Sequence, residues 1–179
     1  TLILKALKIL RYEYKFNEYI HVKLIHGSSM EIVEQIVKLA NRVSSNIELP
    51  SDKSLKLLAP NKTKEKVLQP LKFARDLNLA KKQKTIGMST QLIIGATPES
   101  DRDILKLSSA LYDKALLKRV YYSAYIPVND NKNLPSIITK PPLLREHRLY
   151  QADWLLRFYD FSWDEIVTDE FPNLDQDLD

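Results

Sequence analysis

Polar residues that could bind a ligand follow the expected β-strands of this chain. They occupy four strand exits: His26-Gly27, Asn46-Ile47-Glu48, residues 95–99 (GATPE) and Tyr125-Ile126-Pro127. Ligands of parallel sheets gather beyond the carboxyl ends of the strands. We therefore expect any chemistry of this chain at these four places.

Asn46 and Glu48 form the first candidate pair. They stand two residues apart on an expected strand, so their side chains should point to the same face of the sheet. There an amide and a carboxylate together could hold the hydroxyl groups of a ribose. A polar pair held by neighbouring lysines or arginines would look the same, and the sequence leaves both interpretations open.

Gly95 ends another expected strand, on which Gln91, Ile93 and Gly95 share one face. Glycine lets a flat ring or another backbone approach closely. Gly95 could therefore serve a ligand, although glycine at a strand-to-helix turn also serves the turn itself. Glu99 follows in the expected first helical turn, where a carboxylate stabilises the helix dipole.

Composition excludes several classes of site. The chain has no cysteine, which excludes disulfides, cysteine nucleophiles, thiolate zinc sites and iron–sulfur ligands contributed by this chain. Its histidines, His21, His26 and His147, are too widely spaced for a two-histidine helical metal motif. The glycines cannot form either common phosphate-binding loop, and Ser123 lacks the context of a serine hydrolase.

Charge is distributed unevenly along the chain. Residues 52–84 carry ten lysines and arginines against three acidic residues, whereas residues 160–179 carry eight acidic residues and no basic one. The basic stretch permits a nucleic-acid surface, but a solvated helix face is the commoner meaning of such a run. We expect the acidic end to be a frayed tail.

The pattern of helices and strands predicts an α/β fold. The expected helices are 2–14 (apolar stripe Ile3, Leu7, Leu10, Tyr14), one after a Ser28–Glu31 capping box, 54–58, one capped by Thr63 and kinked at Pro70, 97–115 and 143–160; the expected strands are 19–25, 42–49, 89–96 and 119–128. Strands that alternate with helices are typical of parallel sheets. Periodicity does not separate part of a (βα) barrel from a doubly wound sheet.

The last expected helix, 143–160, is apolar around most of its circumference, which predicts burial. Its charged residues should then form buried ion pairs rather than a catalytic group around His147. By the same argument Trp154 and Phe158 are core residues rather than platforms for stacked bases. The residues that need partners are Arg145, Arg148, Asp153 and Arg157.

Four segments resemble the later part of radical S-adenosylmethionine (SAM) proteins described as DNA modification or repair proteins. They are NIELPSDKSLKLLAPNK (46–62), STQLIIGATPESDRDIL (89–105), LKRVYYSAYIPVND (117–130) and PPLLREHRLYQADWLLRFY (141–159). The resemblance implies a partial (βα) TIM-like barrel of about six units, whose third to sixth strands lie in this chain. Residues 1–161 would form this part of the barrel, and residues 162–179 an acidic C-terminal tail or linker.

The resemblance also implies site residues. Asn46 and Glu48 are similar to an Asn-x-Asp pattern of biotin synthase, with glutamate for aspartate, that meets the ribose of SAM. Ile93 and Gly95 match the core of the fifth-strand GxIxGxxE pattern, whereas Gln91 replaces its first glycine and Glu99 comes one residue late. A basic residue, Lys62 or Lys64, would meet the methionine carboxylate.

The implied function is that of a cytoplasmic radical SAM iron–sulfur enzyme. A [4Fe-4S] cluster in the full-length protein would cleave SAM to a 5′-deoxyadenosyl radical. Thr1 falls inside an expected helix and the chain lacks cysteine, so we expect a fragment that is inactive alone. DNA and a uracil-DNA-glycosylase-like partner follow from the resemblance only, and no stretch has the roughly 18 apolar residues of a membrane span.

Two other functions stay open. The chain could be a non-catalytic α/β module in which strand ends hold a nucleotide and the basic stretch contacts a polyanion. It could also be a structural subunit that docks through residues 143–161. A partial barrel would expose the strand that starts at Tyr19, so we further expect self-association or poor solubility.

Overall fold

Four parallel β-strands form one sheet in the order β1-β2-β3-β4, which confirms the predicted α/β class. The computed structural model describes residues 1–80, 85–115 and 117–177. The elements are α1 Leu2–Lys8, a π-helical turn Ile9–Glu13, β1 His21–Lys23, α2 Met30–Leu39, β2 Arg42–Ser44, α3 Asp52–Leu58, α4 Lys64–Leu79, β3 Gly87–Ile94, α5 Asp101–Ala115, β4 Arg119–Ala124, α6 Leu143–Phe158 and α7 Trp163–Ile166.

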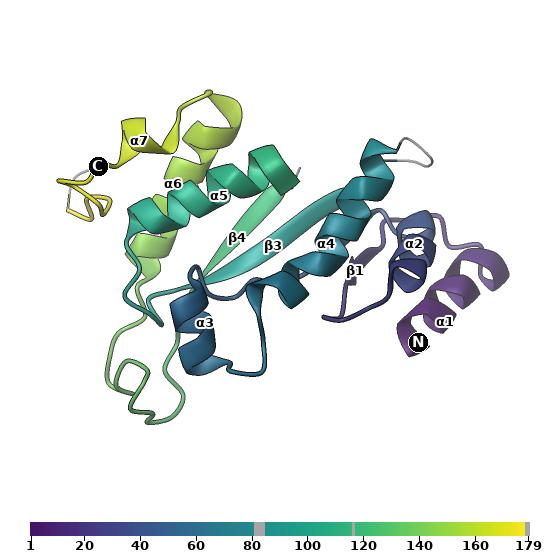
Figure 1. Ribbon diagram of the computed structural model, residues 1–179, viewed down its shortest axis with the longest axis horizontal. Coiled ribbons are helices and arrows are strands. Elements are labelled where there is room, and N and C mark those ends of the chain that lie inside the picture. Colours follow the sequence, from purple (N-terminus) through teal and green to yellow (C-terminus); the bar gives the residue numbers. More distant parts are fainter. Residues whose placement is uncertain (81–84, 116, 178–179) are drawn as a thin grey trace.

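The long helices pack side by side in chain order. α2 packs against α4, α4 against α5, and α5 against α6, while α1 covers the flank of α2. Crossovers between consecutive parallel strands are right-handed, which places their helices on one face of the sheet. Figure 1 shows this sequence of helices, with α1 at one end of the molecule and α6 and α7 at the other.

The core lies between the sheet and these helices. Alternate strand residues face the helices and are almost completely buried: Val22, Val43, Met88, Leu92, Ile94, Val120 and Tyr122. Leu71 on α4, Leu105 on α5 and Leu149 on α6 meet them, each at most 1% exposed. Burying a side chain of this size stabilises a fold by about 1.5–3 kcal/mol. The strand periodicity of two therefore fixes which face receives the helices.

The two edges of the sheet differ. Along the outer edge of β4, side-chain groups accept or donate to the backbone; the pairs are Tyr112 Oη with Val120 N, Tyr150 Oη with Tyr122 N and O, and Glu146 Oε2 with Ala124 N. Along β1, the backbone groups of His21 and Lys23 that point away from β2 have no partner within the described residues. The β4 edge is therefore closed and the β1 edge is open.

The N-terminal helix differs from its prediction. Leu4 and Leu7 are its buried residues, whereas Ile3, Leu10 and Tyr14 are 37%, 38% and 76% exposed. The predicted stripe assumed 3.6 residues per turn throughout. Because a π-helical turn follows Lys8, the later residues are rotated away from that stripe.

Three other helices also differ from the sequence pattern. Ser29 rather than Ser28 precedes α2, because the Ser28 hydroxyl donates to the Ile25 carbonyl in the preceding turn. α4 is neither interrupted nor split at Pro70, whose ring is buried in the helix-to-sheet layer. α5 begins at Asp101, after a reciprocal pair of hydrogen bonds between Ser100 and Asp103.

The acidic C-terminal segment packs against α5 instead of fraying. Val167 is 2% exposed, and the Leu174 N–H donates to the buried Asp101 carboxylate. The Arg102 guanidinium lies 4.9 Å from the centre of the Trp163 ring and pairs with Asp169. The acidic residues of this segment therefore complement basic groups of α5. None of the described helices is long and apolar enough to cross a membrane.

Candidate functional site

The face of the sheet opposite the helices is polar and carries a hollow. The hollow has a volume of about 260 Å³, and His21, Lys23, Ser44, Asn46, Gln91 and Tyr121 are among its lining residues. Parallel sheets are ordinarily covered on both faces. A polar face that none of the described helices covers is therefore the best-placed binding surface of this chain, and we call it the open face.

The open face has a positive character. Lys23, Arg42 and Arg119 occupy strand positions on it, and none of its described strand positions holds an aspartate or glutamate. His21 Nε2 lies 2.9 Å from Ser44 Oγ. Burial, and then the nearby Arg42 charge, lower the pKa of His21 from its usual value of 6.5.

Arg42 crosses the open face from β2 to β4. Its Nη1 donates to Tyr121 Oη over 2.9 Å, and its side chain passes over Gly87 on the intervening strand. A Cβ at Gly87 would lie 3.7 Å from Arg42 Nε. Arg119 lies 5.3 Å from the centre of the Tyr121 ring. Two cations therefore flank one partly exposed aromatic ring.

Asn46 lines the hollow, but it does not stand on a strand. β2 ends at Ser44, and the Asn46 Nδ2 donates to Gln91 Oε1 over 3.2 Å. Its amide is thus held over the open face by β3 rather than by its own strand.

Glu48 does not share a strand face with Asn46, contrary to the prediction. Its backbone has φ +68, and it exchanges hydrogen bonds with β3 as an isolated bridge to Leu92. Because a left-handed residue breaks the alternation of an extended chain, the two-residue spacing does not predict a common face here. The Glu48 carboxylate instead accepts from Lys62 Nζ at 2.8 Å.

Lys62 and Lys64 lie beyond β2, as expected, and both have partners. Lys62 pairs with Glu48, while Lys64 Nζ donates to the Pro50 carbonyl over 2.9 Å. His26 lies near the first pair, and its Nδ1 is 3.3 Å from Ser45 Oγ. Burial, then the Lys62 charge, lower the pKa of His26, with Glu48 opposing them.

Gly95 follows β3 with φ +86, a conformation that favours glycine. A Cβ there would lie 2.6 Å from Pro142 Cγ. Pro142, at the start of α6, therefore occupies the space that a flat ligand ring was expected to use. Ile93 is partly buried beside it and packs with Leu49 and Ala96 in a small apolar cluster.

Glu99 connects two segments instead of opening a helix. It precedes α5, and its Oε1 accepts from the hydroxyl groups of Ser51 and Ser54 at the start of α3. Burial raises the pKa of Glu99, but hydrogen bonds from Ser51, Ser54 and Thr97 outweigh it and lower the pKa below its usual value. Glu99 is therefore a carboxylate that holds α3 in place.

α6 is amphipathic rather than buried on all sides. The expected ion pairs exist between Arg145 and the buried Asp101 and between Arg157 and the buried Asp153. Trp154 and Phe158, however, are 51% and 56% exposed, so their prediction as core residues was wrong. α6 covers the β4 edge of the sheet and packs against α5, which leaves its outer side in solvent. His147 is exposed as well.

Within the described residues, no three histidine, cysteine, aspartate or glutamate side chains gather where they could hold an ion.

Comparison with protein-family models, with curated proteins and with solved structures finds no significant match to this chain.

Sequence reasoning overlooked the residues that dominate the open face. Arg42, Arg119 and Tyr121 lie at strand interiors or starts, whereas the site residues predicted from the sequence follow the strand exits. Their signal was the alternation of polar and apolar residues in HVK, RVS and RVYYSA. A strand covered by helices on both faces lacks such alternation, so it marks one uncovered face.

Proposed function

We propose that this chain is the later part of a partial (βα) barrel and that its open face holds S-adenosylmethionine in a radical SAM enzyme that acts on nucleic acid. The observation that supports it most is the strand order. Four parallel strands follow one another without reversal, with their helices in one layer. A doubly wound sheet reverses its order at a switch point, whereas a barrel does not.

The residues of the open face suit part of the cofactor. Asn46 lines the hollow, and a side-chain amide can bind ribose hydroxyls. Lys62 would meet the methionine carboxylate, although its charge is now shared with Glu48. Gly95 suits the adenine less well, because Pro142 fills the space beside it.

The chain itself supplies no cluster ligand, because it has no cysteine. In the proposal the ligands of a [4Fe-4S] cluster would come from outside this chain, and the cluster would supply the electron that reductive SAM cleavage needs. The role of the residues described here is to bind and orient the cofactor and the substrate.

Equilibrium dialysis of the chain against radiolabelled SAM tests the proposal. We expect weak binding, with Kd on the order of 1 mM, that Asn46→Ala abolishes. Asn61→Ala is the matched control, because Asn61 is an exposed asparagine in the loop before α4. Absence of binding to the unaltered chain, or equal binding by both variants, would reject this site.

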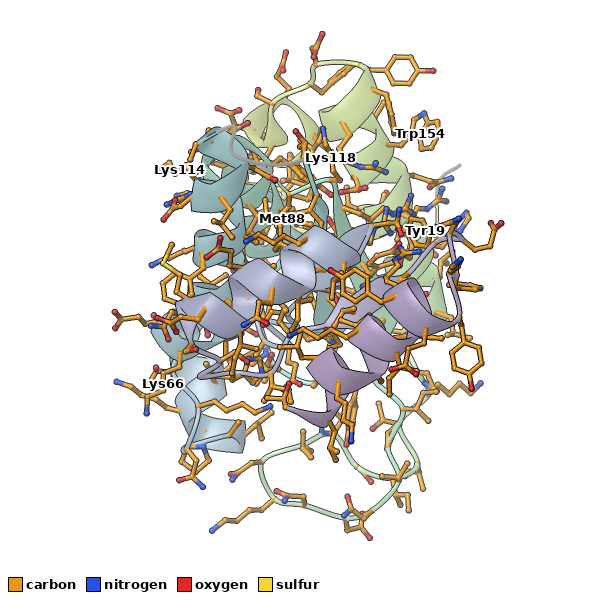
Figure 2. All side chains as sticks on the ribbon, turned by 90° about the vertical axis from the view of Figure 1, so that its right-hand side faces the viewer. Tyr19, Lys66, Met88, Lys114, Lys118 and Trp154 are labelled. Atoms are coloured by element: carbon orange, nitrogen blue, oxygen red, sulfur yellow. The ribbon has the colours of Figure 1, made fainter. Side chains whose placement is uncertain are left out.

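A non-catalytic polyanion-binding module is the second candidate. It is favoured by the exposed lysines Lys53 and Lys56 on α3 and Lys66 and Lys72 on α4. Lys66 projects from the periphery of the molecule in Figure 2, on the same side as Lys114 of α5. Binding through this helical layer would fall steeply with salt and would be weakened by Lys66→Gln and Lys72→Gln together.

A further inference from the structure

Tyr121 and the two arginines beside it form a distinct feature of the open face. Tyr121 is 36% exposed, its hydroxyl accepts from Arg42, and Arg119 lies 5.3 Å from its ring centre. We propose that these three residues are a platform that stacks one base of a single-stranded nucleic acid and binds the adjoining phosphate. This deepens the proposed function, since it rests on the open face as the binding surface and names the class of substrate.

The two arginines have spare binding capacity. Neither forms an ion pair within the described residues, and both side chains are only partly buried. A phosphate oxygen is a strong acceptor for the planar donor array of arginine, so a phosphodiester on the open face would pair with these two charges.

Contacts with both arginines hold the side chain of Tyr121. Gly87 and Ser89, which lie on β3 between Arg42 and β4, leave the space beneath Arg42 free of large side chains, and Gln91 is the β3 residue opposite Tyr121. The Tyr121 hydroxyl is fixed by Arg42 from one side, and Arg119 lies against the ring. Aromatic rings and arginine planes are the surfaces on which unpaired bases stack.

The size of the hollow selects single strands. Its volume of about 260 Å³ is near the lower limit of ligand pockets, about 300 Å³, so its Tyr121 side has room for a single base and not for a longer stretch of nucleic acid. A base inside a duplex is stacked on both sides and cannot reach such a platform without being flipped out. An acidic peptide would satisfy the arginines but would leave the aromatic ring without a flat partner.

Fluorescence anisotropy of a labelled single-stranded oligonucleotide tests the platform. We expect Tyr121→Ala to weaken binding by about 5- to 150-fold, the range measured for one stacked base, and Tyr121→Phe to stay within about twofold because it keeps the ring. Arg42→Gln and Arg119→Gln should each reduce the slope of log affinity against log salt by about 1.

Matched controls separate this platform from other surfaces. Tyr159→Ala removes another exposed tyrosine, at the end of α6, and Lys66→Gln removes a cation of the helical layer. Unchanged binding by Tyr121→Ala, equal losses in these controls, or equal competition by duplex of the same sequence would overturn the inference. If Tyr121→Ala does not fold, Tyr121→Leu keeps the bulk without the flat ring and must show the same loss.

SAM dialysis on the same variants distinguishes this inference from the proposed function. Loss of oligonucleotide binding in Tyr121→Ala with no SAM binding by any variant supports the platform and rejects the cofactor site. SAM binding that depends on Asn46, together with oligonucleotide binding that ignores Tyr121, rejects the platform alone.

Discussion

At the scale of single residues, Gly95 shows most clearly how backbone conformation and close packing together restrict which residue a loop can hold. Gly95 and Gly27 both have positive φ, +86 and +79, but a Cβ at Gly27 would meet nothing within 4 Å. A left-handed alanine costs about 1–2 kcal/mol at either position. The contact with Pro142 adds a further cost at Gly95 alone.

We therefore expect Gly95→Ala to lower the free energy of unfolding by about 1–3 kcal/mol more than Gly27→Ala does. Urea denaturation of both variants measures the difference. Pro142→Ala should recover part of the loss when combined with Gly95→Ala, because it removes the atom nearest to the new Cβ. Equal losses of unfolding free energy in Gly95→Ala and Gly27→Ala would show that the contact with Pro142 is not the reason why position 95 holds a glycine.

Two histidines, His21 on the open face and His26 in the loop after β1, predict a pH dependence. The pKa values of His21 and His26 are lowered from 6.5 mainly by burial, then by Arg42 for His21 and by Lys62 for His26. Because the unfolded chain takes up protons first, stability should fall as the pH drops below about 6.5 and level off below the folded pKa values. Denaturant midpoints measured at several pH values test this sign.

NMR titration of the imidazole protons tests the cause. Both midpoints should lie below 6.5. Arg42→Gln should raise the titration midpoint of His21 and leave that of His26 unchanged, because the Arg42 charge lowers the pKa of His21 but not that of His26. A His21 midpoint that stays fixed in Arg42→Gln would contradict the assigned role of the Arg42 charge.

Among the elements, α6 depends on two buried carboxylates. Asp153 is completely buried and accepts from Tyr112, from Tyr122 over 3.2 Å and from Arg157 over 2.7 Å. Removing one partner of a buried ion pair leaves the other uncompensated, at a cost of about 3–5 kcal/mol.

Asp153→Ala should therefore destabilise the fold by about 3–5 kcal/mol in urea denaturation. Glu34→Ala is the control, because the Glu34–Lys38 pair on α2 is exposed and should contribute no more than about 0.5 kcal/mol. Similar losses in the two variants would show that the network around Asp153 does not anchor α6.

Sequence patterns predicted the elements better than their ends. All four strands and the four long helices α2, α4, α5 and α6 lie where the sequence pattern predicted them, because burial against one sheet face sets the apolar periodicity. The ends of the helices and strands depend instead on which of several competing local hydrogen bonds form. Thr97-Pro98 resembled a helix start, yet Ser100 and Asp103 satisfy each other and begin α5.

The candidate site was predictable only in part, for a related reason. Asn46 was found because a polar residue after a strand marks the sheet edge. The Glu48–Lys62 pair depends on a positive φ at Glu48, and the Arg42–Tyr121 contact joins residues 79 positions apart. Neither kind of information is carried by local spacing.

At the scale of the whole molecule, exposed apolar groups gather at the α1–β1 end. Tyr19 and Ile25, which flank β1, are 60% and 57% exposed, and Tyr12 is 67% exposed. An open strand edge bordered by such residues favours contact with another sheet edge.

We expect sedimentation velocity to detect self-association of the chain at micromolar concentrations and Tyr19→Lys to weaken it. Phe171→Lys replaces an aromatic side chain of similar exposure, 67%, at the opposite end of the molecule, and should leave association unchanged. A monodisperse monomer, or an equal effect of the two substitutions, would contradict this expectation.

The closed edge of β4 sets a limit on such association. Growth of a filament by strand addition needs two receptive edges in each subunit, one to bind and one to be bound. Here Tyr112, Tyr150 and Glu146 already occupy the second edge. Each molecule is thus monovalent toward strand pairing, so edge contacts can join two copies but cannot polymerise them.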